Sequence, residues 1–330
     1  MKQVIADVKS CNRTIDAVGH RVVHGGAHTQ PEIITPAVVK QLEMLCELAP
    51  LHDPSEVEGI KVCLSLMNVP QVAVFDTAFH QTLPPKAYTY AIPRKFANKY
   101  HIRRYGFHGI SHKYVAHEAA KILGKPLAQL KLITCHLGNG QSICAIDRGK
   151  SVDTSMGFTP LEGLVMGSRS GDLDPALVAY LAEKEKIPAA RVVNLLNKES
   201  GLLGLSGKKD LRDIIASMKS WKGKGSQHAR LAFDVMCHRL VKYLGAYYVE
   251  LGGCDAIVFT AGIGEHAALL RENVLKQLSC IGVALDSSAN RKNKAIITKY
   301  SSRIKALVIP TNEELMIARE VEHLLKLTRR

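Results

Sequence analysis

The sequence predicts an α/β fold, and two observations support this class. Apolar runs typical of buried strands alternate along the chain with segments of helical spacing, as they do in layered α/β proteins. Glycine-rich and charged residues gather where the expected strands end, which is where open α/β sheets bind their ligands. With 330 residues, the chain is long enough for two domains or one large domain.

In the first part of the chain, capping residues define the expected elements. Asp53 as N-cap and Pro54 as the first helical residue open one helix, and Gly124 closes another. An apolar run before Asp76 predicts a buried strand that ends in a charged side chain. The expected elements are helices over residues 42–48, 54–66 and 113–123 and a strand within residues 71–80.

From residue 130 onward, glycine-rich turns follow several of the expected strands. Gly138-Asn139-Gly140 predicts a tight turn with positive φ angles and bare backbone N–H groups, which can bind a phosphate. Asp174 and Pro175 open a helix. The expected elements are strands over 130–134 and 142–146, a strand and glycine turn over 255–266, a strand within 306–315, and helices over 174–185, 231–250, 267–278 and the C-terminal segment.

The composition argues against several classes of protein. The formal net charge is +14, with the excess in residues 208–230, 291–305 and the last two arginines. Aromatic residues are not interleaved with these charges, so we expect a basic surface that attracts small anions and no nucleic-acid partner. No apolar run is long enough to span a membrane, and the first residues lack a signal-peptide core. The sequence therefore predicts a cytoplasmic protein without a membrane partner.

Cysteine and histidine spacing does not predict a metal centre. The eight cysteines occur singly, without a C-x-x-C pair, which is typical of reduced thiols. Among fourteen histidines, His108 and His112 have i, i+4 spacing. Gly106 and Gly109 argue against a helix there.

Three polar residues of the first part of the chain are candidates for a site. Arg21 lies between apolar residues at a glycine-containing turn, where it can hold a carboxylate or phosphate with two hydrogen bonds or form a structural ion pair. Asp76 can bind a metal, orient an arginine or cap a turn. His108 lies in a segment rich in hydrogen-bond donors and glycine. It can act as a catalyst or serve as a structural histidine.

Later segments contain further candidate site residues, which are charged side chains near glycines or at the start of a helix. Arg169 lies between Gly167 and Gly171, where it can neutralise a transferring phosphoryl group or be an exposed loop arginine. The run "TAGIGEH" is a strand–glycine–helix nucleotide signal that lacks the full G-x-G-x-x-G spacing. Glu313 and Glu314 can hold magnesium or act as first-turn acids of a helix. Two arginines, carboxylates at strand ends and two glycine-rich turns together favour phosphoryl transfer.

Nine sequence runs resemble those of the acetate kinase family, in the family's order and over nearly the whole chain. They are "GHRVVHGG", "PLHDP", "AVFDTAFHQTLP", "RRYGFHGISH", "CHLGNG", "SVDTSMGFTPLEGLVMGSRSGDLDP", "ESGLLGLSG", "FTAGIGEH" and "IPTNEEL". Propionate kinase is similar enough to be hard to separate. The resemblance implies the actin-like (ribonuclease H-like) fold of sugar kinases and heat-shock ATPases, with the active site in a cleft between two domains, and a homodimer.

The resemblance also implies the domains, the substrates and the site. The first domain would comprise residues 1–78 with 314–330, and the second, which binds nucleotide and forms the dimer, residues 79–313. The partners would be ATP and acetate or propionate, with Mg²⁺ as the metal and Mn²⁺ as an alternative. The implied site residues are Asp76, His108 and Arg169 for catalysis; Arg21 for the substrate carboxylate; Val23, Leu51, Phe107 and Pro160 for the acyl methyl; Glu313 for magnesium; and His136, Leu137, Gly138, Asn139, Gly140, Asp210, Leu211, Arg212, Gly262, Ile263, Gly264, Glu265 and His266 for the nucleotide.

Several departures from the family's pattern affect the expected nucleotide contacts. Gln141 stands where a small residue is usual, His266 where asparagine is usual, and "SGKKDLRD" adds Lys208 and Lys209. The family begins with a strand and an N-x-G-S-S-S hairpin, and the sequence contains no such motif. The resemblance therefore implies an N-terminally truncated first domain and little activity, with a non-catalytic remnant that binds nucleotide as the alternative to a kinase.

Overall fold

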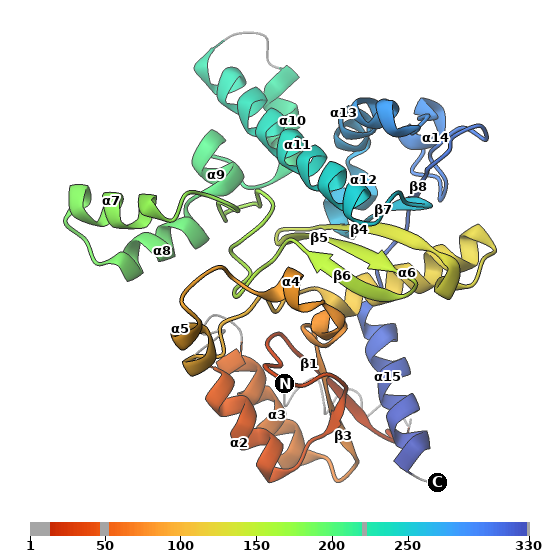
Figure 1. Cartoon of the computed structure of the whole chain (residues 1–330). Helices are drawn as coiled ribbons and strands as arrows, with labels where there is room; N and C mark the ends of the chain where they lie inside the picture. Colours follow the sequence, from red (N-terminus) through yellow and green to blue (C-terminus); the bar gives the residue numbers. More distant parts are fainter. Residues whose placement is uncertain (1–13, 47–52, 220–222, 329–330) are drawn as a thin grey trace. The chain divides into compact units, whose positions relative to one another are not determined.

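The computed structural model describes residues 14–46, 53–219 and 223–328, and contacts within the chain divide it into two compact units (Figure 1). Unit 1 comprises Met1–Thr82, Tyr105–Tyr114 and Asn312–Arg330, and unit 2 comprises Leu83–Arg104 and Val115–Thr311. These units group residues 105–114 with the N-terminal segment, whereas the expected first domain ends at residue 78 and resumes at 314. The expected domain boundaries stay a prediction.

Unit 1 contains a three-stranded sheet in the order β1-β3-β2. β1 (Val18–Val22) is parallel to β3 (Gln71–Phe75), and β2 (Glu32–Ile33) is antiparallel to it. All five residues of β3 are buried because both faces of the strand are covered. Alternate residues pack with α2 (Pro36–Leu45) and α3 (Asp53–Leu66) on one face and with α15 (Glu313–Thr328) on the other.

The helices of unit 1 begin earlier than the sequence predicts. Thr35 caps α2 by accepting a hydrogen bond from the Val38 amide at 3.3 Å, so this helix begins at Pro36 and not at residue 42. α6 (Gly109–Leu123), which starts in this unit, begins at Gly109 and not at residue 113. The prediction that glycine excludes a helix through His112 is wrong, since the His112 amide donates to the His108 carbonyl at 2.9 Å.

Gly109 is needed for a close approach of two backbones. Its amide donates to the carbonyl of Asp76 at 2.9 Å. A Cβ atom at this position would lie only 2.1 Å from the same oxygen atom. A glycine that was expected to break the helix therefore begins it, because only glycine lets the helix start against the chain that follows β3.

Unit 2 is built on a five-stranded sheet in the order β6-β5-β4-β7-β8. β4, β5 and β6 form an antiparallel meander, whereas β4, β7 and β8 run parallel. The C-terminal ends of these parallel strands therefore meet at one edge of the sheet. The bounds are β4 Lys131–Leu137, β5 Gln141–Asp147, β6 Lys150–Thr154, β7 Ala256–Thr260 and β8 Lys305–Val308.

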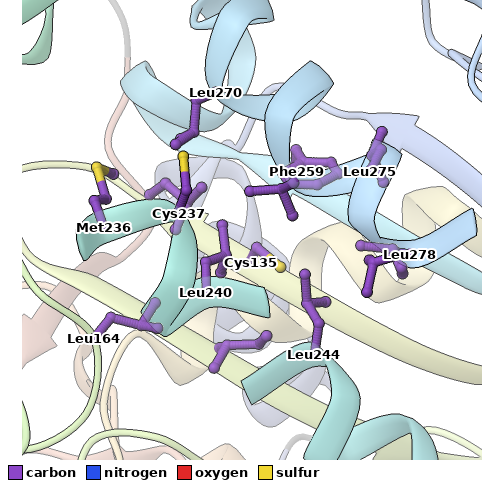
Figure 2. Packing of buried hydrophobic residues seen from close by; sticks show 14 of the residues in the cluster. Cys135, Leu164, Met236, Cys237, Leu240, Leu244, Phe259, Leu270, Leu275 and Leu278 are labelled. Carbon is purple, nitrogen blue, oxygen red and sulfur yellow. The ribbon is translucent and has the colours of Figure 1, made fainter. Parts of the chain in front are cut away.

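The core of unit 2 lies between this sheet and the long helix α11 (Lys224–Glu250) (Figure 2). Leu240 and Leu244 of α11 are buried in one apolar cluster with Cys135 of β4 and Phe259 of β7. Burial of a large apolar side chain contributes roughly 1.5–3 kcal/mol, so this cluster fixes the strand ends that bear the candidate site.

Unit 2 contains further helices, some of which contribute buried residues to this core. The expected helix after Asp174 and Pro175 is confirmed as α7, whereas the expected glycine turn after β7 forms a short helix, α12. The bounds are α4 Pro85–Tyr88, α5 Arg94–Lys99, α7 Ala176–Glu185, α8 Ala189–Lys198, α9 Gly201–Ser206, α10 Leu211–Lys219, α12 Ala261–His266, α13 Ala268–Gln277 and α14 Ser287–Arg291. In the described parts of the chain, no helix is both long and apolar enough to cross a bilayer.

Candidate active site

Unit 1 brings Arg21, Asp76 and Glu313 together at one edge of its sheet. Arg21 lies near the end of β1 and Asp76 directly follows the parallel strand β3, so both side chains reach the same edge. Nε of Arg21 donates to Oδ2 of Asp76 at 3.1 Å, and Nη2 donates to the same oxygen. Nε also lies 3.6 Å from Oε2 of Glu313, the first residue of α15.

One carboxylate oxygen of this cluster has no hydrogen-bond partner in the described parts of the chain. The Asp76 side chain is 1% exposed, and its Oδ1 atom accepts no hydrogen bond from any described residue. The negative charge of Asp76 raises the pKa of Arg21. Burial, together with the charge of Asp76, raises the pKa of Glu313, while Arg21 opposes that rise. Two neighbouring carboxylates with an unpartnered buried oxygen favour a bound cation.

The cluster fits a magnesium ion that takes its other ligands from a substrate. Mg²⁺ is commonly held by one or two carboxylates together with phosphate oxygens and water. Among the described residues there is no group of three or more His, Cys, Asp or Glu side chains that could hold a metal alone. Asp76 and Glu313 would therefore supply only part of the coordination.

The predicted acyl-pocket residues of unit 1 are buried close to His24. The exposed fractions of Val23 and Phe107 are 7% and 2%. The ring of His24 packs edge-on against Phe107, with 5.7 Å between the centroids. Burial lowers the pKa of His24 to about 4, so this imidazole is neutral. Leu51 lies outside the described residues, and Pro160 belongs to unit 2.

His108 has an unusual backbone conformation. Its φ angle is 56°, in the left-handed region that non-glycine residues rarely adopt. The hydrogen bond to its carbonyl from His112 and the start of α6 at the next residue fix this conformation. Such strained positions are common at functional sites.

In unit 2, the hairpin His136–Gly140 joins β4 to β5 beside the segment after β7. Gly138 does not adopt a positive φ, which contradicts the sequence-based expectation for this residue. A Cβ atom at this position would lie 3.3 Å from the Gly140 carbonyl oxygen, which is slightly tight, and 3.8 Å from Cβ of Ala261, which is an ordinary van der Waals contact. In the neighbouring segment after β7, Ala261 adopts the left-handed backbone conformation, with a φ angle of 63°.

The segment Gly262–His266, which follows β7 and belongs to helix α12, lies next to β4 and its hairpin. His136 of β4 is paired in register with Thr260 of the parallel strand β7. α12 starts directly after Thr260 and contains all five predicted nucleotide residues of this segment. The structure therefore places two of the three predicted nucleotide segments side by side.

Arg169 has no acidic partner in the described part of the chain. Its Nη1 atom donates to the Pro160 carbonyl at 3.4 Å and to the sulfur of Met166 at 3.9 Å. Burial lowers the pKa of its guanidinium, which is the expected effect on a cation without a counter-charge. The loop that bears it reaches the hairpin, because the Gly167 amide donates to the Asn139 carbonyl at 3.2 Å. This guanidinium is available for an anionic ligand.

The third predicted nucleotide segment, 210–212, forms a local pair. Asp210 accepts hydrogen bonds from Nε and Nη2 of Arg212, at 3.1 and 2.6 Å. The Arg212 side chain is 91% exposed. The carbonyl of Lys209 lies near Gly167, so this segment borders the Arg169 loop.

Two arginines of unit 2 that bind several backbone carbonyls each were not predicted from the sequence. Arg104 donates from Nη1 to three successive carbonyls, those of residues 154–156, and from Nη2 to Glu162 at 2.5 Å. It thereby fixes the chain that leads to Pro160. Arg271, which is fully buried, donates to two carbonyls of α12. Only tertiary structure reveals these contacts, and no local motif marks either residue.

Comparison with known proteins identifies the family. The sequence model of the Acetokinase family matches residues 1–319 of this chain. Acetate kinase of Halothermothrix orenii is 55% identical over 317 residues, covering 94% of this chain and 79% of that protein. Acetate kinase of Carboxydothermus hydrogenoformans is 54% identical over 310 residues, covering 93% and 77%.

Solved structures agree with this relationship and with the predicted kinase fold. The crystal structure of Porphyromonas gingivalis acetate kinase superimposes with a TM-score of 0.92 at 42% identity, covering 98% of this chain and 85% of that one. A propionate kinase from Francisella tularensis gives a TM-score of 0.91 at 44% identity, covering 97% and 82%. Sequence and fold agree over nearly all of this chain, which therefore belongs to the acetokinase family.

Proposed function

We propose that this protein is an acetate kinase, which transfers a phosphoryl group reversibly between ATP and acetate to give acetyl phosphate and ADP. The observation that best supports this function is the cluster of Arg21, Asp76 and Glu313, in which a buried carboxylate oxygen has no hydrogen-bond partner among the described residues. Curated relatives that are more than half identical are acetate kinases. A phosphotransferase with a carboxyl group as acceptor fits both findings.

The chemistry needs no general base, because acetate is already ionised at neutral pH. Its carboxylate oxygen attacks the γ-phosphorus, the bond to the leaving oxygen of ADP breaks, and no proton has to move. The main barrier is the approach of two anions, so the protein must supply positive charge and positioning. We assign the binding of the acetate carboxylate to Arg21 and the stabilisation of the transferring phosphoryl group to Arg169 and His108.

Asp76 and Glu313 would hold the magnesium ion. A bound Mg²⁺ would neutralise phosphate charge and orient the phosphate chain. Asp76 also fixes the orientation of Arg21 through Oδ2, while Oδ1 remains for the metal. We therefore assign Asp76 the role of an organiser of charge and not of a proton acceptor.

The nucleotide would bind along three segments. These are the hairpin His136–Gly140, the segment Gly262–His266 and the three residues Asp210, Leu211 and Arg212. The adjacency of the first two segments at the ends of parallel strands supports this assignment. Backbone N–H groups at such strand ends can contact phosphate oxygens.

The acyl pocket would be lined by Val23, Leu51, Phe107 and Pro160. An apolar pocket discriminates a single methylene by only roughly 1–3 kcal/mol. Propionate should therefore be accepted more weakly than acetate, and propionate kinase remains the second candidate because of the Francisella tularensis structure. The homodimer, the cytoplasmic location and the domain boundaries at residues 78 and 314 are further proposals from the resemblance.

A direct assay tests this function. ATP-dependent acetyl phosphate formation should require Mg²⁺ and should fall at least about a hundredfold in Asp76→Asn, because the metal and Arg21 both lose an anchoring charge. Acetate and propionate should be compared by kcat/KM in the same assay. A larger value for propionate would assign the second candidate function, and MgADP binding without any phosphoryl transfer would favour a non-catalytic nucleotide-binding protein.

A further inference from the structure

Arg271 is a fully buried arginine on α13 whose five N–H groups all donate to neutral oxygen atoms. Nε donates to Oδ1 of Asn290 at 2.9 Å. Nη1 donates to the carbonyls of Gly264 and Glu265 at 2.7 and 2.8 Å. Nη2 donates to the carbonyl of Asn290 at 2.9 Å and to Oδ1 of Asn293 at 2.5 Å. No acidic side chain pairs with it within the described residues.

A buried cation without a counter-charge is an expensive way to hold a fold together. Removing a guanidinium from water carries a large desolvation penalty, and apolar residues of similar volume are often at least as stabilising in such places. Burial lowers the pKa of Arg271 to about 10, so the side chain is still charged at neutral pH. Local stability alone therefore does not account for an arginine here.

The segment that Arg271 holds requires support. Gly264 and Glu265 lie in α12, which begins at Ala261 with its left-handed φ of 63°. A strained backbone of this kind persists only where its surroundings fix it. Figure 1 shows α12, α13 and α14 grouped at one side of unit 2, and Arg271 links all three through its hydrogen bonds. The Glu265 side chain adds a contact by accepting from the Thr311 amide at 3.2 Å.

We propose that Arg271 is the positioning residue of the segment Gly262–His266 and that its unbalanced positive charge strengthens the binding of an anionic nucleotide there. This inference rests on the proposed function, because it takes the segment to be a nucleotide contact. The planar fork of arginine fixes the two carbonyls of α12 and the two asparagines at once, which a lysine cannot do.

Substitutions separate geometry from charge. Arg271→Met removes both and should raise the Kd for MgADP about tenfold or more, as expected for loss of charged hydrogen bonds. Arg271→Lys keeps the charge but loses the fork, and should have a smaller effect. Asn293→Gly removes one acceptor while tolerating the φ of 48° at this position, and should weaken MgADP binding slightly. This variant keeps the inference testable if Arg271 variants do not fold.

Lys276→Gln is the matched control, since it removes one positive charge from the same helix. Lys276 is 64% exposed and pairs with Glu272 on the surface, so its loss should leave the Kd for MgADP unchanged.

The experiment measures MgADP binding by calorimetry, together with KM for ATP and for acetate, on the full chain and its folded variants. The expected result is a rise in the nucleotide constants with KM for acetate within about twofold of wild type. An unchanged Kd in Arg271→Met would overturn the inference, as would a parallel rise in both substrates' constants, which indicates a general structural role. Wild type that binds MgADP but forms no acetyl phosphate would overturn the kinase assignment alone; wild type that binds no MgADP would overturn both.

Discussion

At the residue scale, the two arginines assigned to the reaction differ in what balances their charge. Arg21 is paired with Asp76 and lies close to Glu313. Arg169 contacts only neutral groups in the described structure. An arginine held by carboxylates is oriented before the ligand arrives, whereas an unbalanced one can respond to charge that develops on a phosphoryl group. The two should therefore affect different kinetic constants.

Arg169→Ala should lower kcat about a hundredfold or more, the usual cost of losing one group that stabilises transition-state charge. Arg21→Ala should mainly raise KM for acetate, because it removes the two-point grip on the carboxylate. Arg191→Ala, at an arginine that is 53% exposed and pairs with Glu199, is the control. Steady-state kinetics on all three would decide the matter, and an unchanged kcat in Arg169→Ala would refute its assignment.

At the element scale, the start of α6 couples a helix to the site. Gly109 contacts the backbone of Asp76, and His108 precedes it in the left-handed conformation. The helix cannot move toward solvent without releasing the hydrogen bond between Gly109 and Asp76. This helix terminus is therefore tied to the backbone of Asp76, whose carboxylate accepts hydrogen bonds from Arg21.

Gly109→Ala should destabilise the fold by about 1–3 kcal/mol and reduce activity, since the new methyl group overlaps the Asp76 carbonyl. Gly245→Ala is the matched control, a helical glycine of α11 around which a Cβ atom meets nothing within 4 Å. This substitution should stabilise the protein by about 0.5–1 kcal/mol. Urea unfolding of the two variants would contradict the argument if both changed stability in the same direction.

The C-terminus of α11 holds a second coupling, between Glu250 and Asp153 of β6. Their carboxyl groups are hydrogen-bonded, and partial desolvation of the surface residue Glu250, together with the charge of Asp153, raises the pKa of Glu250 to about 7. An acid whose pKa is higher in the folded state stabilises the fold when protonated. That stabilisation is complete below the ordinary value of 4.5 and is lost as the pH rises through 7.

Glu250→Gln should remove this dependence, because glutamine does not titrate. The melting temperature of wild type should therefore fall more than that of Glu250→Gln between about pH 5 and about pH 8. Glu199→Gln, at an exposed carboxylate, serves as the control. Identical pH profiles for wild type and Glu250→Gln would show that the carboxyl pair does not contribute.

The sequence predicted helices and strands better than it predicted the structural roles of individual residues. The strand before Asp76 and the hairpin around Gly138 are present, because apolar runs bounded by glycine or charge have few other structures available. Gly138 lacks the positive φ that was expected of its turn, and the role of Gly109 was misjudged, since a neighbour distant in sequence requires glycine there. Arg104 and Arg271 were missed for the same reason: their partners lie in other elements.

At the scale of the whole molecule, the formal net charge of +14 should affect how anionic substrates approach. Excess positive charge raises the local concentration of anions and their association rate, and salt screens this effect over a Debye length of about 10 Å at 0.1 M. Lys208 and Lys209 are exposed and directly precede the proposed nucleotide pair Asp210–Arg212. They are the positive charges best placed in sequence to act on ATP.

kcat/KM for MgATP should therefore fall with rising ionic strength while kcat stays nearly constant, because screening affects encounter and not the bound complex. The double variant Lys208→Gln/Lys209→Gln should lower kcat/KM at low salt and flatten its salt dependence. Lys292→Gln/Lys294→Gln is the matched control, since it removes the same charge from two exposed lysines elsewhere in unit 2. Equal effects of the two pairs would mean that net charge alone attracts the nucleotide. A salt-independent kcat/KM in wild type would mean that the basic surface has no part in binding it.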